Sequence, residues 1–333
     1  MIRIGKISYW HVHAWEYTNE ALNHPNTEIA AVWDEIEERG QASAEKLGVP
    51  FYANLDDMLA RDDIDAVIVD APTNRHREVM VAAAKAGKHI FTEKVVATTL
   101  EDTLAILDEV EKAGVKLTVS LPRLNAGYTL AIRELLEQKA LGEVTLVRVR
   151  LSHNGALAGW LPEHFYSLEQ CGGGALIDLG CHPMYLTNLF LGELPVTIAT
   201  QYGYVSGREV EDNAVATVET KSGAVGIVEA GFVNPHSPFC IEVHGTEGTL
   251  MYGTPEEKLL IRSNVGKFAN AEGWTEVPLP ASRMNAFGQW VEHIENDTAA
   301  TENIQRALNL SKLMDAATRS NKENRKVSLS ELD

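Results

Sequence analysis

The chain has 333 residues, 45% of them hydrophobic and 23% charged, and its 47 acidic against 29 basic residues give a formal net charge of −18. This composition excludes a disordered chain, a collagen-like fibre and a disulfide-stapled miniprotein. The length predicts two domains, and the acidity argues against a nucleic-acid partner, because neutralising phosphates requires clustered Lys and Arg.

Strand-like and helix-like segments alternate over the first 120 residues. Predicted strands cover residues 2–7, 28–33, 66–69, 88–91 and 115–120, and predicted helices cover residues 14–23, 36–47, 75–86 and 100–113. Apolar strands joined by helices are typical of a doubly wound parallel sheet. Residues 1–122 are therefore predicted to form a domain of the α/β class with a doubly wound parallel sheet.

The pattern changes after Pro122. Predicted strands cover residues 143–151, 196–204, 214–220, 224–230, 239–244 and 249–252, and predicted helices cover residues 126–138, 284–296 and 303–319. Turn residues at 222–223 and 246–248 favour antiparallel neighbours. Residues 123–333 are therefore predicted to form a C-terminal α+β domain with a large, mostly antiparallel open sheet.

The cysteines and the N-terminus bear on the compartment. Cys171, Cys181 and Cys240 have no metal-type spacing, and their odd, sparse count fits a reducing environment. The first residues lack the apolar core and cleavage site of a signal peptide, and no run approaches 18 apolar residues. We expect a cytoplasmic protein with no membrane partner.

The turn after the first predicted strand is where a dinucleotide site would need glycines, so that backbone N–H groups can approach a pyrophosphate. Residues 8–13 contain none; the turn consists of Ser8, Tyr9, Trp10, His11, Val12 and His13. Asp34 closes the second strand about 20 residues further on, where a carboxylate can bind an adenosine ribose. Glu35 adds negative charge that would repel a 2′-phosphate, which favours NAD over NADP. The alternative is that Asp34 caps the helix that begins near Ile36.

His11 and His13 flank Val12 in this turn, a spacing that a metal ion could use. Two histidines are weak support, and polar loop residues near a ligand are the alternative. The sequence alone therefore predicts no metal.

Lys94 follows the strand at residues 88–91, on the sheet edge where open α/β proteins bind ligands. A lysine there can orient a substrate hydroxyl and stabilise developing negative charge. Taken alone, it is better interpreted as an ordinary surface lysine.

A second group of polar residues follows three glycines, Gly172 to Gly174. Asp178, His182 and Tyr185 are spaced i, i+4 and i+7, which predicts one shared helix face. A histidine oriented by an aspartate is a candidate general base, whereas the alternative is a capping aspartate beside a core histidine. Pro183 predicts a kink or break in this helix.

Several motifs taken together resemble the Gfo/Idh/MocA oxidoreductase family over essentially the whole chain. They are Ala71 to His76, Glu93-Lys94, Gly172 to His182, Glu211 to Asn213 and Val243 to Gly248. The resemblance implies that residues 1–122 form a Rossmann-type NAD(P)-binding domain and that residues 123–333 bind substrate and form oligomer contacts. It implies NAD(P)-dependent oxidation or reduction of a sugar, polyol or related ring. It implies that Lys94 positions and polarises the reacting oxygen, His182 is the acid–base group and Asp178 orients the substrate or the catalytic pair. It also implies a nicotinamide side formed by Pro72, Thr73, Asn74, His76, Glu93 and Lys94.

Three positions depart from the family pattern. The family's GxGxxG turn is replaced by residues 8–13, its Glu-Lys-Pro triplet is Glu93-Lys94-Val95, and the acidic residue common three positions after the histidine is Tyr185. The first departure bears on cofactor binding, the second on how the lysine is presented, and the third on the substrate pocket.

The leading hypothesis is an NAD-dependent dehydrogenase or reductase of a secondary alcohol or ketone in a carbohydrate-like substrate. A non-catalytic ligand-sensing or partner-binding protein on the same scaffold is the main alternative, because Tyr9 and Trp10 could occlude a pyrophosphate. An NAD-assisted glycoside-cleaving enzyme is another. Further candidates to face the substrate are Arg123, Trp160, His164 and Tyr185. A homodimer or homotetramer would cover the open sheet.

Overall fold

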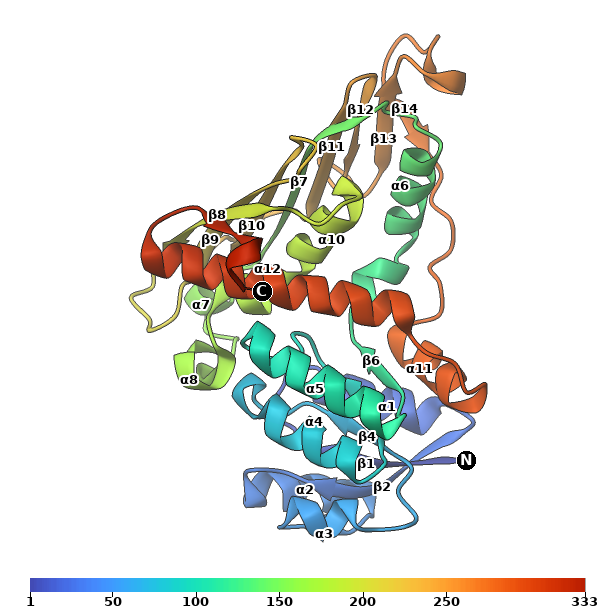
Figure 1. Cartoon of the computed structure of the whole chain (residues 1–333), viewed down its shortest axis with the longest axis vertical. Coiled ribbons are helices and arrows are strands. Elements are labelled where there is room, and N and C mark those ends of the chain that lie inside the picture. The colour runs from blue at the N-terminus through green and yellow to red at the C-terminus, as the bar shows by residue number, and fades with distance from the viewer. Residues whose placement is uncertain (333) are drawn as a thin grey trace. The chain divides into compact units, whose positions relative to one another are not determined.

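The computed structural model describes residues 1–332, which form two compact units (Figure 1). Unit 1 consists of Met1–Leu121 and Met284–Ser311, and unit 2 consists of Pro122–Arg283 and the chain from Lys312 on. Residues 284–311, which the sequence assigned to the C-terminal domain, therefore belong to unit 1.

Unit 1 contains a six-stranded parallel sheet in the order β3-β2-β1-β4-β5-β6. Its strands are β1 (Ile2–Ile7), β2 (Thr27–Trp33), β3 (Phe51–Tyr52), β4 (Ala66–Val69), β5 (His89–Thr92) and β6 (Leu117–Val119). Its helices are α1 (Ala14–Asn23), α2 (Glu37–Leu47), α3 (Leu55–Leu59), α4 (His76–Lys85), α5 (Leu100–Ala113), α11 (Ala286–Glu295) and the short η1 (Thr73–Arg75). The predicted Rossmann-type sheet is confirmed, and the strand order reverses direction between β1 and β4, where such folds bind ligands. The short β3 and α3 were not predicted.

Helix α11 belongs to unit 1 because its aromatic side chains complete the core on one side of the parallel sheet. Trp290 and Phe287 are buried and lie 5.7 Å and 5.6 Å, between ring centroids, from Phe91 in β5. These rings share one cluster with strand residues such as Ile4 and Ile68. Burial of apolar surface therefore assigns this late segment to the first sheet.

Unit 2 contains a nine-stranded sheet in the order β14-β13-β12-β11-β7-β10-β9-β8-β15. Its strands are β7 (Val144–Ser152), β8 (Thr197–Gly203), β9 (Asn213–Glu219), β10 (Val225–Gly231), β11 (Cys240–Gly245), β12 (Gly248–Tyr252), β13 (Leu259–Ser263), β14 (Thr275–Val277) and β15 (Val327–Ser328). Its paired neighbours run antiparallel apart from β7 and β10, which are parallel. The predicted large, mostly antiparallel sheet is confirmed, although β13, β14 and β15 were not predicted.

Unit 2 has three longer helices, α6, α10 and α12, and its other helices are short. The helices are η2 (Pro122–Asn125), α6 (Gly127–Glu137), α7 (Gly155–Ala158), η3 (Glu163–Tyr166), α8 (Leu168–Cys171), α9 (Ala175–Asp178), α10 (Cys181–Leu191), η4 (Gly266–Phe268) and η5 (Leu329–Leu332), and α12 (Thr301–Glu323) crosses the unit boundary. Helix α10 packs on β7 and β10, and all its side chains are buried. Within residues 1–332, no helix has both the length and the apolar character that a bilayer crossing needs.

Candidate active site

The turn after β1 is tight although it lacks glycine. Ser8 adopts the left-handed conformation, with φ at 69°, which glycine adopts most readily. Its N–H donates to the carbonyl oxygen of Trp33 at 2.7 Å, and its Oγ accepts the N–H of Trp10 at 3.1 Å. A serine thus forms the sharp bend that begins the turn.

Tyr9 and Trp10 are both buried, so neither ring projects into solvent. Tyr9 packs in a cluster with Val32 and Ala44, and its hydroxyl lies 3.2 Å from Thr18 Oγ1. The Tyr9 side chain therefore serves as core under the turn.

Asp34, at the end of β2, is buried and has hydrogen bonds on both carboxylate oxygens. Oδ2 accepts the N–H of Tyr9 and Nε of Arg39, both at 2.9 Å. Oδ1 accepts the N–H of Ile36 at 2.8 Å and Nη2 of Arg39 at 2.7 Å. Because the N-cap of α2 is Ile36, the capping role considered for Asp34 is not the one observed.

Arg39 was missed by the sequence analysis, and it changes the electrostatics at this end of the site. Its Nη2 also lies 2.5 Å from an oxygen of Glu35, so one guanidinium partly neutralises both carboxylates. Burial alone would lower the pKa of Arg39, but Asp34 and Glu35 together raise it. The signal in the sequence was the i, i+4 spacing of Glu35 and Arg39.

A buried ion pair lies beneath the turn. Lys6 Nζ in β1 contacts Asp70 Oδ2 directly after β4, and it also donates to the carbonyl oxygen of Ser8 at 2.9 Å. Both side chains are fully buried. Burial raises the pKa of Asp70 to about 6, against the opposing effect of Lys6. The only sequence signal was a lysine inside an apolar strand.

Glu93 and Lys94 lie after β5 and are both nearly inaccessible to solvent, which rules out an ordinary surface lysine. Lys94 Nζ lies 3.8 Å from Glu93 Oε1. Burial would raise the pKa of Glu93, but the positive charges of His11, His13 and Lys94 outweigh it and lower the pKa, so Glu93 is ionised. The peptide bond between Lys94 and Val95 is cis.

The loop after β4 carries four of the residues predicted to face nicotinamide. Pro72 is buried, Thr73 is half-buried and Asn74 is exposed. His76 is buried, with Nε2 3.0 Å from the carbonyl oxygen of Ala71 and Nδ1 3.1 Å from that of Val95. Burial lowers the pKa of His76. His76 therefore ties this loop to the loop after β5.

In unit 2, Asp178 and His182 lie on two successive helices, so the predicted single helix face is wrong. Asp178 ends α9, and α10 begins at Cys181. The predicted break occurs, but before Pro183, which occupies the first turn of α10. A proline is tolerated there because its missing N–H has no partner within the helix.

His182 and Tyr185 are joined by a hydrogen bond in the interior. Nδ1 of His182 lies 3.1 Å from the hydroxyl of Tyr185, and that hydroxyl accepts the backbone N–H of Arg123 at 3.1 Å. The Arg123 guanidinium lies 4.3 Å from the ring centroid of Phe239 and donates to Tyr128. Its backbone thus helps to hold the His182–Tyr185 pair, while its side chain packs among aromatic rings.

Of the two remaining predicted substrate residues, Trp160 lies beside a histidine that the sequence analysis missed. The ring of His153 stacks on Phe232 and lies 4.6 Å, between centroids, from exposed Trp160. Burial lowers the pKa of His153, and the charge of Asp178 acts in the opposite direction. His164, in η3, is half-buried beside Phe165. The position of His153 directly after a strand was the only signal.

Family profiles match both units of the chain. One described as "Oxidoreductase family, NAD-binding Rossmann fold" matches residues 1–121, and one described as "GFO/IDH/MocA C-terminal domain" matches residues 129–251. The D-xylose 1-dehydrogenase (NADP(+)) 2 of Haloferax volcanii is 30% identical over 236 residues, which cover 69% of each chain. The chain belongs to the Gfo/Idh/MocA oxidoreductase family.

Further similarities extend over most of the chain. The 1,5-anhydro-D-fructose reductase of Ensifer adhaerens is 29% identical over 81% of each chain. The crystal structure of an NAD-binding protein from Listeria innocua has a TM-score of 0.83 at 24% identity, over 98% of this chain and 96% of that chain. Curated relatives include dehydrogenases of inositols. Membership confirms the predicted oxidoreductase class.

The dinucleotide that the Gfo/Idh/MocA fold implies can be compared with the residues present. Asp34, after β2, and Arg39, in α2, have the carboxylate and guanidinium groups that suit ribose hydroxyls, which would exchange with the four hydrogen bonds that Asp34 accepts within the protein. The buried ammonium of Lys94 suits the edge where the nicotinamide chemistry would take place. The turn differs, because its N–H groups at Ser8, Tyr9 and Trp10 already have partners within the protein. The residues fit the cofactor at its two ends and differ from the family at its pyrophosphate.

Proposed function

We propose that this chain transfers a hydride between NAD and a secondary alcohol or ketone of a sugar, polyol or inositol-like substrate. The observation that carries the proposal is the hydrogen-bonded chain from the Arg123 N–H through Tyr185 to His182, at the position of the family's acid–base group. The names of the curated relatives support the substrate class.

The hydrogen bonds around Tyr185 bear on which nitrogen of His182 carries a proton. The Tyr185 oxygen accepts the N–H of Arg123, and a buried hydroxyl needs an acceptor for its own proton. Nδ1 of His182, 3.1 Å away, is the acceptor that this geometry supplies. A neutral His182 then carries its proton on Nε2. We assign Nε2–H of the protonated, imidazolium form of His182 as the group that gives its proton to the oxygen of a ketone, which leaves the neutral imidazole.

The other roles follow from charge. When bound, NADH supplies the hydride to the carbonyl carbon. His182 supplies the proton to the carbonyl oxygen, so that the ketone becomes a secondary alcohol. The ammonium of Lys94 stabilises the negative charge that develops on that oxygen. Asp178 orients the substrate.

Ketone-dependent oxidation of NADH tests the proposal. The chain is mixed with NADH and a panel of ketoses and keto-inositols, and absorbance of the reduced nicotinamide is followed. We expect turnover to fall about 10²–10⁴-fold in His182→Ala, because a general acid contributes about that much. Turnover should also be lost in Lys94→Met. His244→Ala, which changes a half-exposed histidine in β11, is the matched control and should retain full activity. Absence of both NADH binding and turnover in the unaltered chain would refute the proposal.

The choice between NAD and NADP depends on Arg39. Glu35 and Asp34 disfavour a 2′-phosphate, whereas the guanidinium of Arg39 can bind one. We propose that NAD is preferred while Arg39 remains paired with both carboxylates. Arg39→Ala should then weaken NADP⁺ binding more than NAD⁺ binding in a fluorescence titration. A variant that weakens both equally would show that Arg39 does not discriminate between them.

A ligand-sensing role is the second candidate function. It is favoured by the internal hydrogen bonds of the turn and by Asp34, whose two oxygens already accept four hydrogen bonds. In that case a sugar would raise the melting temperature without any turnover, because a ligand specific for the native state stabilises it. A melting shift with NAD(H) together with turnover would eliminate this role.

We also propose a homodimer or homotetramer that covers the open sheet of unit 2, in a cytoplasmic setting. The nine-stranded sheet supports this, since several outward side chains such as Val215 in β9 are exposed. Light scattering of the purified chain tests it, and a monomer at micromolar concentration would contradict it.

A further inference from the structure

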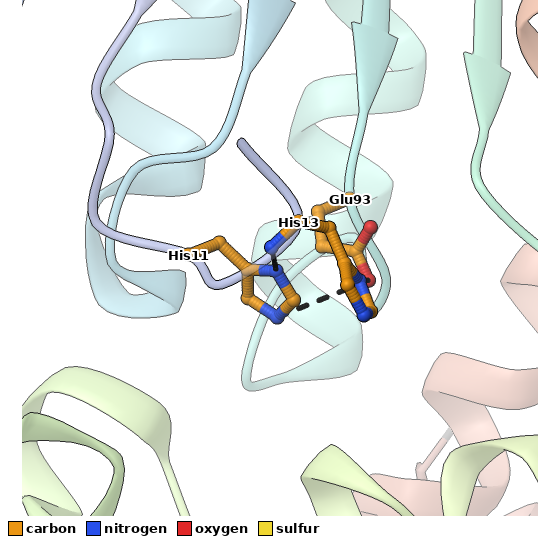
Figure 2. Close-up of side chains that lie close together, drawn as sticks. All are labelled: His11, His13 and Glu93. Atoms are coloured by element: carbon orange, nitrogen blue, oxygen red, sulfur yellow. Dashed lines mark hydrogen bonds and ion pairs between the residues drawn. The ribbon is translucent and has the colours of Figure 1, made fainter. Parts of the chain in front are cut away.

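Three potential metal ligands meet at the carboxyl edge of the parallel sheet in unit 1 (Figure 2). Nε2 of His11 lies 3.9 Å and Nδ1 of His13 lies 3.5 Å from Oε1 of Glu93. One ligand atom from each residue lies within 4.8 Å of the other two. We propose that His11, His13 and Glu93 form a binding site for a divalent transition-metal ion.

The separations suit a single ion. Nitrogen and oxygen ligands bind Zn²⁺ at about 2.1 Å, so two of them at a tetrahedral angle lie about 3.4 Å apart. The measured 3.5 Å and 3.9 Å separations exceed this by at most half an ångström. Small inward shifts of both the His11 and the His13 rings would bring the three ligand atoms within reach of one ion.

The surroundings direct one oxygen of Glu93 toward the histidines. The hydroxyl of Tyr17 donates to Oε2, and it lies 2.7 Å from Oγ of Ser120. Oε1 is left facing the two imidazoles, as Figure 2 shows. A buried, ionised carboxylate beside two imidazoles is a ligand set that suits zinc, cobalt, manganese or iron.

Metal binding here must displace protons. The N–H of His13 donates to Nδ1 of His11 at 3.2 Å, so a neutral His11 carries its proton on Nε2, facing Glu93. A metal ion on Nε2 takes the place of that proton. The ring then carries its proton on Nδ1, which can no longer accept the hydrogen bond from the N–H of His13. The imidazolium forms of His11 and His13 have no lone pair for the ion, so protons compete with the metal and its affinity should fall as the pH falls. The charged groups that act on the cluster from neighbouring elements are Glu16 in α1, Asp70 after β4 and Lys94 after β5.

Three protein ligands leave at least one coordination position open, as in catalytic rather than structural metal sites. The open position would take water or an oxygen of a bound ligand. The sequence showed only the two histidines of the turn, and the parallel pairing of β1, β4 and β5 adds the carboxylate. The assignment stands on these three side chains and does not depend on the proposed hydride transfer.

Cobalt titration of the full-length chain tests the site. The purified protein is treated with a chelator, and CoCl₂ is added while visible ligand-field absorption and binding heat are recorded. We expect saturable binding of one Co²⁺ per chain, with at least about tenfold weaker affinity in His13→Ala and in Glu93→Gln. His13→Ala changes a half-buried side chain, so it tests the site even if the buried Glu93→Gln variant fails to fold.

The matched control is His244→Ala, since His244 lies 3.8 Å from Glu242 as a histidine–carboxylate pair in unit 2. It should bind Co²⁺ like the unaltered chain. No saturable binding, or equal binding in His13→Ala and the unaltered chain, would overturn the proposal. Loss of binding in His13→Ala but not in a folded Glu93→Gln variant would overturn the assignment of Glu93.

Discussion

Glu211 anchors the glycine-rich segment that precedes Asp178, and we predict that its titration changes stability by a measurable amount. Its Oε2 accepts the N–H of Gly174 and its Oε1 that of Leu176, both at 2.9 Å, and its side chain is buried. Burial raises the pKa of Glu211 from 4.5 to about 6, although these hydrogen bonds act against the increase. A difference of about 1.5 pKa units corresponds to about 2 kcal/mol.

The sign follows from linkage. Because the folded state binds this proton more tightly than the unfolded state, the stabilisation is fully present below pH 4.5 and is lost as the pH rises through about 6. Glu211→Gln cannot titrate. The stability of the unaltered chain relative to Glu211→Gln should therefore decrease by about 2 kcal/mol between about pH 4.5 and about pH 6.5.

Urea unfolding followed by circular dichroism, repeated across this pH range for both proteins, measures the difference. Other titrating groups, Asp70 among them, contribute equally to both proteins and cancel. Parallel pH profiles for the two proteins would refute the reasoning, because they would show that Glu211 has the same pKa folded and unfolded.

Three further predictions concern packing and buried charge. Gly174→Ala places a Cβ 2.0 Å from a backbone carbonyl oxygen and should lower the free energy of unfolding by about 1–3 kcal/mol. Gly273→Ala, where nothing lies within 4 Å of the added Cβ, should change that free energy little. Equal urea midpoints for the two variants would contradict this prediction. Lys6→Met leaves the buried Asp70 without its partner and should cost about 3–5 kcal/mol, and adding Asp70→Leu should recover part of that loss. Trp290→Ala should cost about 3–5 kcal/mol in the core of unit 1, and an unchanged melting temperature would show that α11 does not complete that core.

The candidate site shows where local pattern was enough. Lys94 was predicted at a sheet edge from the apolar strand before it, and it lies directly after β5. The helix from Leu100 to Ala113 was predicted in full, because its apolar periodicity and the following Gly114 in the left-handed conformation are local signals. The helix face joining Asp178 to His182 was mispredicted, since spacing alone does not show that a proline begins a new helix.

The sequence by itself determined the α/β class, the order of most strands and helices, and the family, because hydrophobic periodicity and short motifs are properties of neighbouring residues. Only the tertiary structure brought Lys6 onto Asp70, Glu211 onto the glycine-rich segment and Glu93 onto the two histidines of the turn. It also assigned α11 to the first sheet through the burial of Trp290. These contacts join residues that are far apart in the sequence. They meet because of the order of the strands and the burial of apolar surface or charge, which the spacing of neighbouring residues does not encode.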